Sequence, residues 1–258
     1  MIGGSEMHNH LKTKSVTRDN ILAEAKVLII EEGVCSFRLS QIPQRAKCSP
    51  KTFYSHFRSR EDIVAALFVE HVNDILVKTD MIMDMDVLSN KEKIVYTLMY
   101  DIVKCWSAKE GDVCINFLGV SPHVYGVASP EYEGNINVVF IELKARVQEL
   151  WRRAIKSREL LSSKREIIDC IFSMRTIERG SIVIGQNKFL RQHGHDNRIE
   201  TVFNLLCLAA NTLSWTSKQP MSFNKMLKTV TPLVDTAAGT TFKHCRLNYE
   251  TLNEPIEL

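Results

Sequence analysis

The sequence lacks several features that would assign a protein to a particular class. No apolar run approaches the roughly 20 residues that a membrane-spanning helix needs. The first residues, MIGGSEMHNHLKTK, contain no apolar stretch of the kind found in secretory signal peptides. There are only seven cysteines, and no two of them have the C-x-x-C spacing of zinc ligands or redox centres. We therefore expect a cytoplasmic protein whose cysteines are reduced and form no structural disulfides.

Sequence signatures of enzymes are also missing. The chain has no G-x-S-x-G nucleophile motif, no phosphate-binding P-loop and no dinucleotide-binding glycine pattern. His193, His195 and Asp196 stand close together, but two histidines in a glycine-containing turn are more often solvated surface. No thiol or carboxylate pattern completes a zinc site around them. We predict that the protein is not an enzyme, has no catalytic residue, binds no metal and needs no cofactor.

Acidic residues are absent from one long segment. Between Gly33 and Arg60 there is no aspartate or glutamate, and from Lys12 to Arg60 ten lysines and arginines stand against four acidic residues. The whole chain has a formal net charge of only +3, so the remainder is slightly acidic. A basic end on such a body indicates that this end binds a polyanion, with a solvated basic surface as the alternative.

Apolar residues at helical spacing predict an all-α chain. Thr17 is expected to cap the first helix, which Gly33 ends in a left-handed conformation. A short second helix is predicted over Leu39–Ala46. Ser49 and Pro50 then have the residue types of an N-cap and a first helical position, so they open a third helix. The second and third helices are separated by about three residues, which is the spacing of a helix-turn-helix.

The predicted third helix has one apolar face and one polar face. Phe53 and Phe57 lie four residues apart, on a face that can pack against the first helix. The other side offers hydroxyls, an amine, an imidazole and a phenol, which suit base edges and phosphates of the DNA major groove. Ser59 is expected to cap a fourth helix that runs to about Lys78, with Asp62 at its capping-box position.

This N-terminal region resembles the DNA-binding domain of the TetR/AcrR transcriptional regulators. The resemblance covers about 60 of the 258 residues, including FRLSQIPQRAKCSPKTFYSHFRSREDIVAAL from Phe37 to Leu67. Its most specific part is the series Ser49, Thr52, Phe53, Tyr54, His56, Phe57, Ser59, Arg60 and Glu61.

The resemblance implies roles for individual residues. Tyr54 and His56 would contact phosphates, and Arg60 would hold the family's basic position at the start of the fourth helix. Lys51, Thr52 and Ser55 would lie near bases. With their neighbours, the predicted DNA-binding residues are Thr17, Arg38, Ser49, Lys51, Thr52, Tyr54, Ser55, His56, Arg58 and Arg60.

Two positions depart from the family pattern. Pro43 stands inside the second helix where alanine is usual, so it removes one backbone hydrogen bond and is expected to loosen or shorten that helix. Lys47 replaces the usual turn glycine, so a residue with a β-carbon is expected to adopt a left-handed conformation there. Both changes bear on how the recognition helix is placed.

The chain beyond residue 80 is also predicted to be helical. The expected domains are a flexible arm (1–14), the DNA-binding domain (15–78), a helical effector-binding and dimerisation domain (79–245) and a C-terminal tail (246–258). An irregular connection is expected from Gly111 to Gly134. The expected helices are one opened by Ser89-x-x-Glu92, then Asn135–Ser157, Ser163–Leu190 with a bend near Gly180 or Gly185, Ile199–Trp215, and Ser222–Ala238 interrupted by Pro232.

In TetR-like proteins, a helical domain of this kind pairs two subunits and often binds a small ligand. A homodimer places two recognition helices on successive major-groove faces of a palindromic operator in double-stranded DNA. The segment Ile199–Trp215 is apolar nearly all round, so it is the predicted dimer seam together with the helix from Ser222. Burial within one subunit is the alternative.

For a ligand site, large apolar side chains with a few polar anchors are expected. A buried Arg175 would need a partner, and a carboxylate ligand is one possibility. The ligand would then be a small hydrophobic or amphipathic effector. The predicted ligand-binding residues are Trp106, Phe117, His123, Tyr125, Phe140, Trp151, Phe172 and Arg175, with Met174 beside them. Each of them is also compatible with plain core.

Together, these patterns predict a dimeric DNA-binding transcriptional regulator without a membrane-bound part. The favoured mechanism is a repressor that a ligand releases from its operator, with the fourth helix as hinge. One alternative is a DNA-binding protein that acts through a protein partner, whose body would contain no pocket of ligand size. Another is a helical enzyme or ligand carrier whose basic end is incidental.

Overall fold

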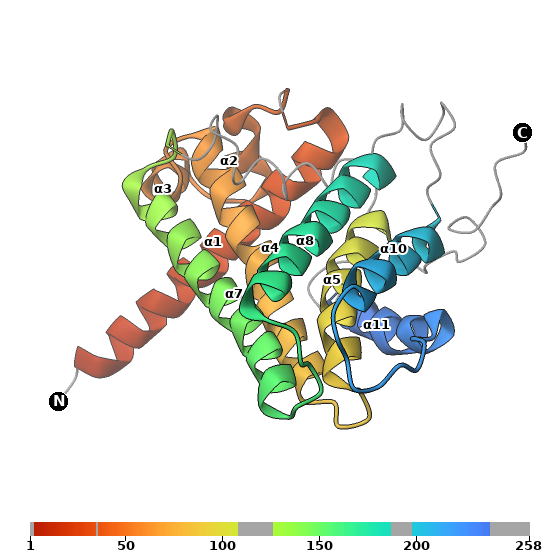
Figure 1. Cartoon of the computed structure of the whole chain (residues 1–258). Coiled ribbons are helices and arrows are strands. Elements are labelled where there is room, and N and C mark those ends of the chain that lie inside the picture. Colours follow the sequence, from red (N-terminus) through yellow and green to blue (C-terminus); the bar gives the residue numbers. More distant parts are fainter. Residues whose placement is uncertain (1–2, 35, 108–125, 187–197, 238–258) are drawn as a thin grey trace, which may run out of the picture. The chain divides into compact units, whose positions relative to one another are not determined.

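The computed structural model describes residues 3–34, 36–107, 126–186 and 198–237. These residues form helices and connections, with one isolated β-bridge between Leu160 and Trp215, so the predicted all-α class is confirmed. None of the described helices is both long and apolar enough to span a membrane. The elements are α1 (Gly3–Glu32), η1 (Leu39–Gln41), α2 (Ile42–Arg45), α3 (Pro50–His56), α4 (Arg60–Met83), α5 (Asn90–Ser107), α7 (Pro130–Lys156), α8 (Lys164–Gln186), α10 (Ile199–Asn211) and α11 (Phe223–Ala237) (Figure 1).

Two compact units can be distinguished by their internal contacts. Unit 1 combines Met1–Asn73 with Lys109–Ile141, and unit 2 combines Asp74–Ala108 with Glu142–Leu258. The division falls within α4 and within α7, so each of these helices contributes to both units. The unit that contains the helix-turn-helix thus includes the first turns of α7. The expected boundaries at residues 14, 78 and 245 stay predictions.

The core of unit 1 is formed by α1 and the short helices after it. Gly33 ends α1 as predicted: its φ is 84°, and its N–H donates to the carbonyl of Ile29 at 2.9 Å. Its deeply buried apolar side chains, with at most 1% exposure, include Ile21, Leu22, Ala25, Leu28, Ile29, Phe37, Ile42, Phe53, Phe57 and Ile63. Phe53 and Phe57 among them are the pair that the helical spacing predicted to face inward.

The prediction that Thr17 caps the first helix is wrong. The helix begins at Gly3, so Thr17 lies within it. Residues 5–16 contain no proline or glycine, so nothing in the sequence stops the helix from extending toward the N-terminus.

The second predicted helix is split into two short pieces. Leu39–Gln41 form a 3₁₀ turn, and α2 follows with Pro43 as its second residue. Proline is tolerated at the start of an α-helix, where its missing N–H has no intrahelical acceptor. The expected shortening by Pro43 is therefore confirmed, because only four residues, Ile42–Arg45, remain α-helical.

Unit 2 is built around α5, which packs against α8, α10 and α11 (Figure 1). The predicted start of α5 is confirmed, since the N–H of Ser89 donates to Glu92 at 2.9 Å and the N–H of Glu92 donates to the Ser89 hydroxyl at 3.3 Å. The same reciprocal pair opens α8, where the N–H of Ser163 donates to Glu166 at 2.7 Å. Two capping boxes therefore fix where these helices begin.

The structure corrects the predicted start of α7 and the predicted interruption of α11. The helix α7 begins at Pro130 and not at Asn135, because Pro130 takes the first helical position. The helix α8 runs without a break past Gly180 and Gly185 to Gln186, and its predicted end at Leu190 lies outside the described residues. Pro232 does not interrupt α11, whose side chains Met226, Val230 and Leu233 stay buried on either side of it.

Candidate nucleic-acid interface

The helix α3 is formed by local interactions that its sequence specifies. The N–H of Thr52 donates to the Ser49 hydroxyl at 3.0 Å, and Pro50 is the first helical residue. Phe53 and Phe57 are both fully buried. These predictions for the third helix are confirmed, and they fix which face of α3 is turned outward.

The outward face carries Lys51, Tyr54 and Ser55, all of them exposed. Tyr54 is 51% exposed, and its ring meets that of Phe53 edge to face at 5.0 Å. The Ser55 hydroxyl donates to the carbonyl of Thr52 at 2.7 Å, so it offers an incoming group its lone pairs. The Thr52 hydroxyl is within 2.8 Å of the Ser49 hydroxyl, and Thr52 is only partly exposed.

Arginine side chains near this face differ in their exposure and in whether another side chain already contacts their guanidinium group. Arg38 and Arg58 are exposed, and Arg58 follows α3 directly. The guanidinium of Arg60 lies 5.1 Å from the centre of the Phe37 ring and is half-buried. Arg45 is paired with Glu31 at 2.8 Å. Arg38 and Arg58 are thus better placed than Arg60 or Arg45 to meet a phosphate.

The turn before α3 has the strained conformation that the sequence suggested. Lys47 has a φ of 51°, which is left-handed. The N–H of Cys48 donates to the carbonyl of Pro43 at 3.0 Å, and the N–H of Ala46 to that of Ile42 at 2.8 Å. These bonds close α2 and hold the exposed Lys47 in this conformation.

Residues of α1 lie close to the same region. Thr17 is half-buried in the middle of the helix and does not act as a cap. Its neighbour Arg18 has its guanidinium carbon 5.8 Å from the centre of the Phe57 ring. One face of α1 therefore packs against the residue that ends α3.

One contact to α3 comes from far along the chain. The hydroxyl of Tyr132, near the start of α7, donates to the carbonyl of His56 at 2.8 Å. Its ring stacks on Phe57 with a centroid distance of 5.5 Å. The side chain of His56 is half-buried. Sequence patterns could not indicate this contact, because the two residues are 76 positions apart.

The predicted ligand-binding residues are only partly brought together. Trp151 and Arg175 line a cavity of about 30 Å³ between α5, α7 and α8. That volume holds about one water molecule. The other residues of the lining are Ile94, Thr97, Leu98, Val147, Leu150, Ile171 and Met174.

The remaining members of that set lie elsewhere. Trp106 donates to the carbonyl of Ser181 at 3.1 Å, away from the cavity. Phe140 belongs to unit 1, where its ring is 5.7 Å from that of Phe68, and Phe172 is 74% exposed on α8. Outside the described residues lie Phe117, His123 and Tyr125, as do His193, His195 and Asp196.

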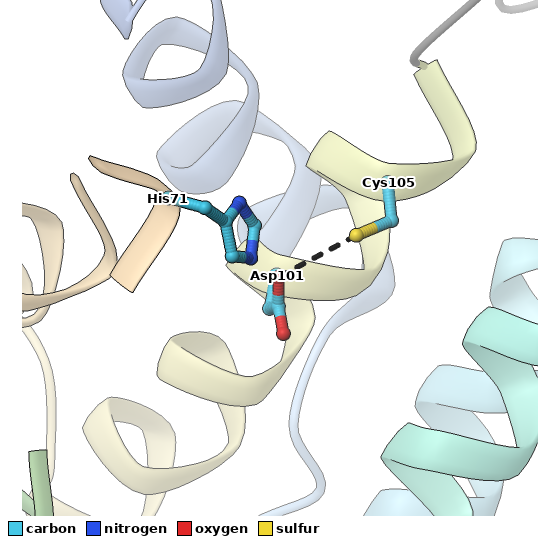
Figure 2. A group of neighbouring side chains, drawn as sticks. All are labelled: His71, Asp101 and Cys105. Atoms are coloured by element: carbon cyan, nitrogen blue, oxygen red, sulfur yellow. Dashed lines mark hydrogen bonds between the residues drawn. The ribbon is translucent and has the colours of Figure 1, made fainter. Parts of the chain in front are cut away.

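Arg175 is half-buried, and its partner is present in the chain itself. Glu178, 1% exposed, accepts from Arg175 at 2.7 and 3.1 Å. Burial raises the pKa of Glu178, while the guanidinium of Arg175 acts in the opposite direction. Nearby on α5, the thiol of Cys105 donates to Asp101 at 3.5 Å (Figure 2). Burial raises the pKa of Cys105, which disfavours the thiolate form of this side chain.

A second cavity, of about 160 Å³, is polar and was not predicted. Its lining includes Lys91, which is 8% exposed, and the Lys91 amine donates to the Asn211 side chain at 2.5 Å. Burial lowers the pKa of Lys91. Glu92 and Lys225 pair across the same cavity at 2.7 Å. The charges of this lining thus compensate one another, which is the pattern of a structural network.

Comparison with known proteins agrees with the N-terminal pattern. Residues 21–67 match the family model described as bacterial regulatory proteins, tetR family. None of the curated protein sequences matches the chain. The matched residues run from Ile21 in α1 to Leu67 in α4, so they include the whole helix-turn-helix.

Several solved structures share the fold. They include transcriptional regulator FadR from Bacillus subtilis in complex with stearoyl-CoA, with a TM-score of 0.54 and 17% identity over 76% of this chain and 98% of that one. Reduced NemR from E. coli has a TM-score of 0.55 and 16% identity, covering 78% and 99%. A TetR-family regulator from Agrobacterium tumefaciens has a TM-score of 0.54 and 18% identity, covering 78% and 99%. The tetR family match therefore falls on the segment from α1 to α4, and the chain shares its fold with these regulators.

Proposed function

We propose that this protein is a sequence-specific DNA-binding transcriptional regulator, and that α3 is its recognition helix. The observation that carries the proposal is the division of α3 into a buried face, Phe53 and Phe57, and an exposed face with Lys51, Tyr54 and Ser55. Short polar side chains on an exposed helix suit the base edges of the major groove. The exposed cations Arg38 and Arg58 supply the phosphate contacts that orient such a helix.

The regulator acts as a homodimer in this proposal. Exposed apolar side chains gather on α8 and α10, two helices that pack against each other. Ile168 and Phe172 lie one turn apart on α8, with exposures of 53% and 74%, and Leu205 and Leu208 on α10 have 45% and 64%. Exposed apolar residues on adjacent helices mark an interaction surface. A second copy is the occupant that a palindromic operator requires.

This surface differs from the predicted dimer seam in one of its two helices. The sequence suggested α10 together with the helix that follows it, α11. Within the described part of α11, no large apolar side chain is strongly exposed, and its apolar residues Met226, Val230 and Leu233 are buried. We therefore keep α10 in the proposed seam and put α8 in the place of α11.

A repressor released by a small hydrophobic or amphipathic ligand remains the favoured regulatory mode. The cavity with Trp151 and Arg175 supports it, because apolar walls surround one cation. FadR from Bacillus subtilis, which shares the fold, was solved with stearoyl-CoA. A cavity of about 30 Å³ is too small for such molecules, so α5, α7 and α8 must separate to admit one. A carboxylate ligand would then compete with Glu178 for Arg175.

The small size of this cavity also supports a second candidate. A regulator controlled by a protein partner needs no ligand-sized space between its helices. The apolar cavity in the described part of the chain holds about one water molecule, as expected of a packed core. The two candidates differ in whether a small molecule alone can release the DNA.

The DNA-binding proposal is tested by selecting bound sequences from a random duplex pool with the full-length protein near physiological salt. We expect a palindrome whose half-sites are about 34–36 Å apart, or one helical turn. Recovery of a single half-site would reject the dimer, and recovery of unenriched DNA would reject sequence-specific binding.

Regulation is tested on the complex with the selected operator. Decanoate is titrated as an amphipathic carboxylate, with decanol as a matched neutral compound, and DNA release is followed by fluorescence anisotropy. Release by decanoate at lower concentration than decanol supports the Arg175 site. Equal potency would mean that Arg175 does not bind the carboxylate, and no release by either would favour the protein partner.

A further inference from the structure

We propose that the first turn of α7 is a positioning element for the recognition helix, and that Tyr132 is its key residue. The inference rests on the proposed function of α3 in DNA binding. It concerns contacts within unit 1 that join residues 126–136 to the end of α3 and the turn after it.

The hydroxyl of Tyr132 binds the end of α3 directly. His56 is the last residue of α3, and the last carbonyls of a helix have no acceptor role within it. The Tyr132 hydroxyl donates to the His56 carbonyl at 2.8 Å, and Tyr132 is only 5% exposed. Burial raises the pKa of Tyr132 to about 12, with Arg18 acting in the opposite direction. The phenol is therefore a donor throughout the physiological range.

The ring of Tyr132 adds a second contact at the same place. It stacks on Phe57 at 5.5 Å with an interplanar angle of 26°. Phe57 is fully buried, and the Arg18 guanidinium lies on it at 5.8 Å. Phe57 is thus held between α1 and α7, and it is the residue at which the chain leaves α3.

A buried carboxylate joins the next turn to the same part of the chain. Asp62 is 1% exposed, and its two oxygens accept from different segments. One accepts the N–H of Arg58 at 2.9 Å, and the other accepts the N–H of Ser129 at 2.8 Å. Ser129 directly precedes α7, and its carbonyl accepts the N–H of Tyr132 at 2.9 Å. A short chain of bonds therefore runs from Arg58 through Asp62 and Ser129 to Tyr132.

These bonds act on the groups proposed to meet DNA. Tyr54 stands two residues before His56, and Arg58 stands two residues after it. Fixing the His56 carbonyl and the Arg58 N–H orients both side chains before DNA arrives. Binding DNA with a preordered helix end avoids the loss of conformational freedom at that step. Tyr132 acts through α3 and need not touch DNA.

The test is Tyr132→Phe, which keeps the stacked ring and removes the hydrogen bond. Removing one such bond corresponds to a change of about fivefold in an equilibrium constant, so we expect operator affinity to fall about fivefold. The slope of log affinity against log salt should not change, because no phosphate contact is lost. In the free protein, amide hydrogen exchange at Phe57 and Arg58 should become faster.

Tyr96→Phe is the matched control. Tyr96 is fully buried in unit 2, and its hydroxyl makes no hydrogen bond of ordinary geometry among the described residues, although Glu92 lies near it. This variant should retain wild-type operator affinity, salt slope and exchange at Phe57 and Arg58. A similar affinity loss in both variants would reject a specific role for Tyr132.

Other results separate the possible failures. Unchanged affinity and unchanged exchange in Tyr132→Phe would reject the positioning role. A smaller salt slope would also reject it, because Tyr132 would then contact a phosphate itself. If the wild-type protein bound no duplex, the proposed function would fail, and exchange in the free protein would still decide whether Tyr132 orders the end of α3.

Discussion

Lys47 has a backbone conformation that favours glycine. Its φ is 51°, and a residue with a β-carbon pays roughly 1–2 kcal/mol there. We therefore expect Lys47→Gly to stabilise the protein by about 1 kcal/mol. The greater conformational entropy of glycine in the unfolded chain reduces this gain. Lys47→Ala removes the amine and keeps the β-carbon, so it should give no such gain. Urea denaturation compares the variants, and equal stability of Gly and Ala would contradict the strain argument.

The exposed cations near α3 differ in what they should recognise. Arg58→Ala should weaken binding to all duplexes and lower the salt slope by about 0.9, the value for one phosphate contact. Lys51→Ala should instead weaken discrimination at one base pair. The difference in binding free energy between the operator and the single-base variant should fall by about 1–3 kcal/mol. Affinity measured over a salt series, with the operator and with single-base variants, separates the two effects. The reverse pattern would mean that α3 enters the groove in another orientation.

Local chemistry decided which site residues could be predicted. Ser49, Pro50, Phe53 and Phe57 form a cap and an apolar pair within eight positions, and they lie as the sequence indicated. Tyr132 was not foreseen, because its bond to His56 spans 76 positions and depends on how α7 begins. Interactions at short separation follow from residue type and spacing. Long-range ones depend on packing that one sequence does not reveal.

The helix α8 contains two glycines with opposite surroundings. Gly180 is exposed, and a β-carbon there would meet nothing within 4 Å, so Gly180→Ala should stabilise the helix by about 1 kcal/mol. A β-carbon at Gly185 would lie 2.1 Å from the indole of Trp106. Gly185→Ala should therefore destabilise the protein by about 1–3 kcal/mol. Thermal unfolding of both variants tests this, and a stabilised Gly185→Ala would show that Trp106 is not packed on α8.

Helix ends were predictable where side chains cap them. Ser89 with Glu92 and Ser163 with Glu166 marked the starts of α5 and α8 within one residue. The start of α1 carries no such signal, and the residue type of Thr17 alone predicts a cap that the helix does not use. The composition of Gly111–Gly134 predicts an irregular connection, but Pro130 opens α7, because proline at the first position favours a helix.

The helix α7 resembles α4, the proposed hinge, because both helices contribute to the two compact units. The helix α4 runs unbroken from Arg60 to Met83 and contributes to both compact units. The helix α7 does the same, with Tyr132 in unit 1 and Trp151 in unit 2. Any regulatory change in unit 2 thus has two continuous helices through which it can act on α3.

At the scale of the whole molecule, the proposed dimer is tested by introducing a charged side chain into its proposed seam. Phe172→Glu should convert the dimer to monomers and abolish binding to the palindrome, because a carboxylate would be desolvated between two copies. Val138→Glu is the control, since Val138 is 54% exposed on the unit 1 part of α7. Sedimentation velocity measures the mass of each. If the Phe172→Glu variant remained dimeric, α8 would not be part of the dimer seam.

The all-α class was accessible from sequence, whereas the composition of the compact units was not. Apolar spacing marks helices one at a time, and it predicted correctly that Phe53 and Phe57 of α3 are buried. Residues 126–141 join the helix-turn-helix through Asp62, Phe57 and Phe68. Phe57 and Phe68 are ordinary apolar positions in the sequence, and Asp62 is a helix-capping residue, so no local pattern predicts their contacts with residues 126–141.

That pairing affects the order in which the protein can mature on the ribosome. All of α3 has been synthesised by residue 56, yet Ser129 and Tyr132 are added more than 70 residues later. Domains usually fold as units while synthesis proceeds. Until α7 emerges, the nascent helix-turn-helix lacks the partners of Phe57 and Asp62, and a fragment ending near residue 78 would lack them permanently. Grafting this DNA-binding head onto another regulator would therefore require the start of α7 to be carried along with it.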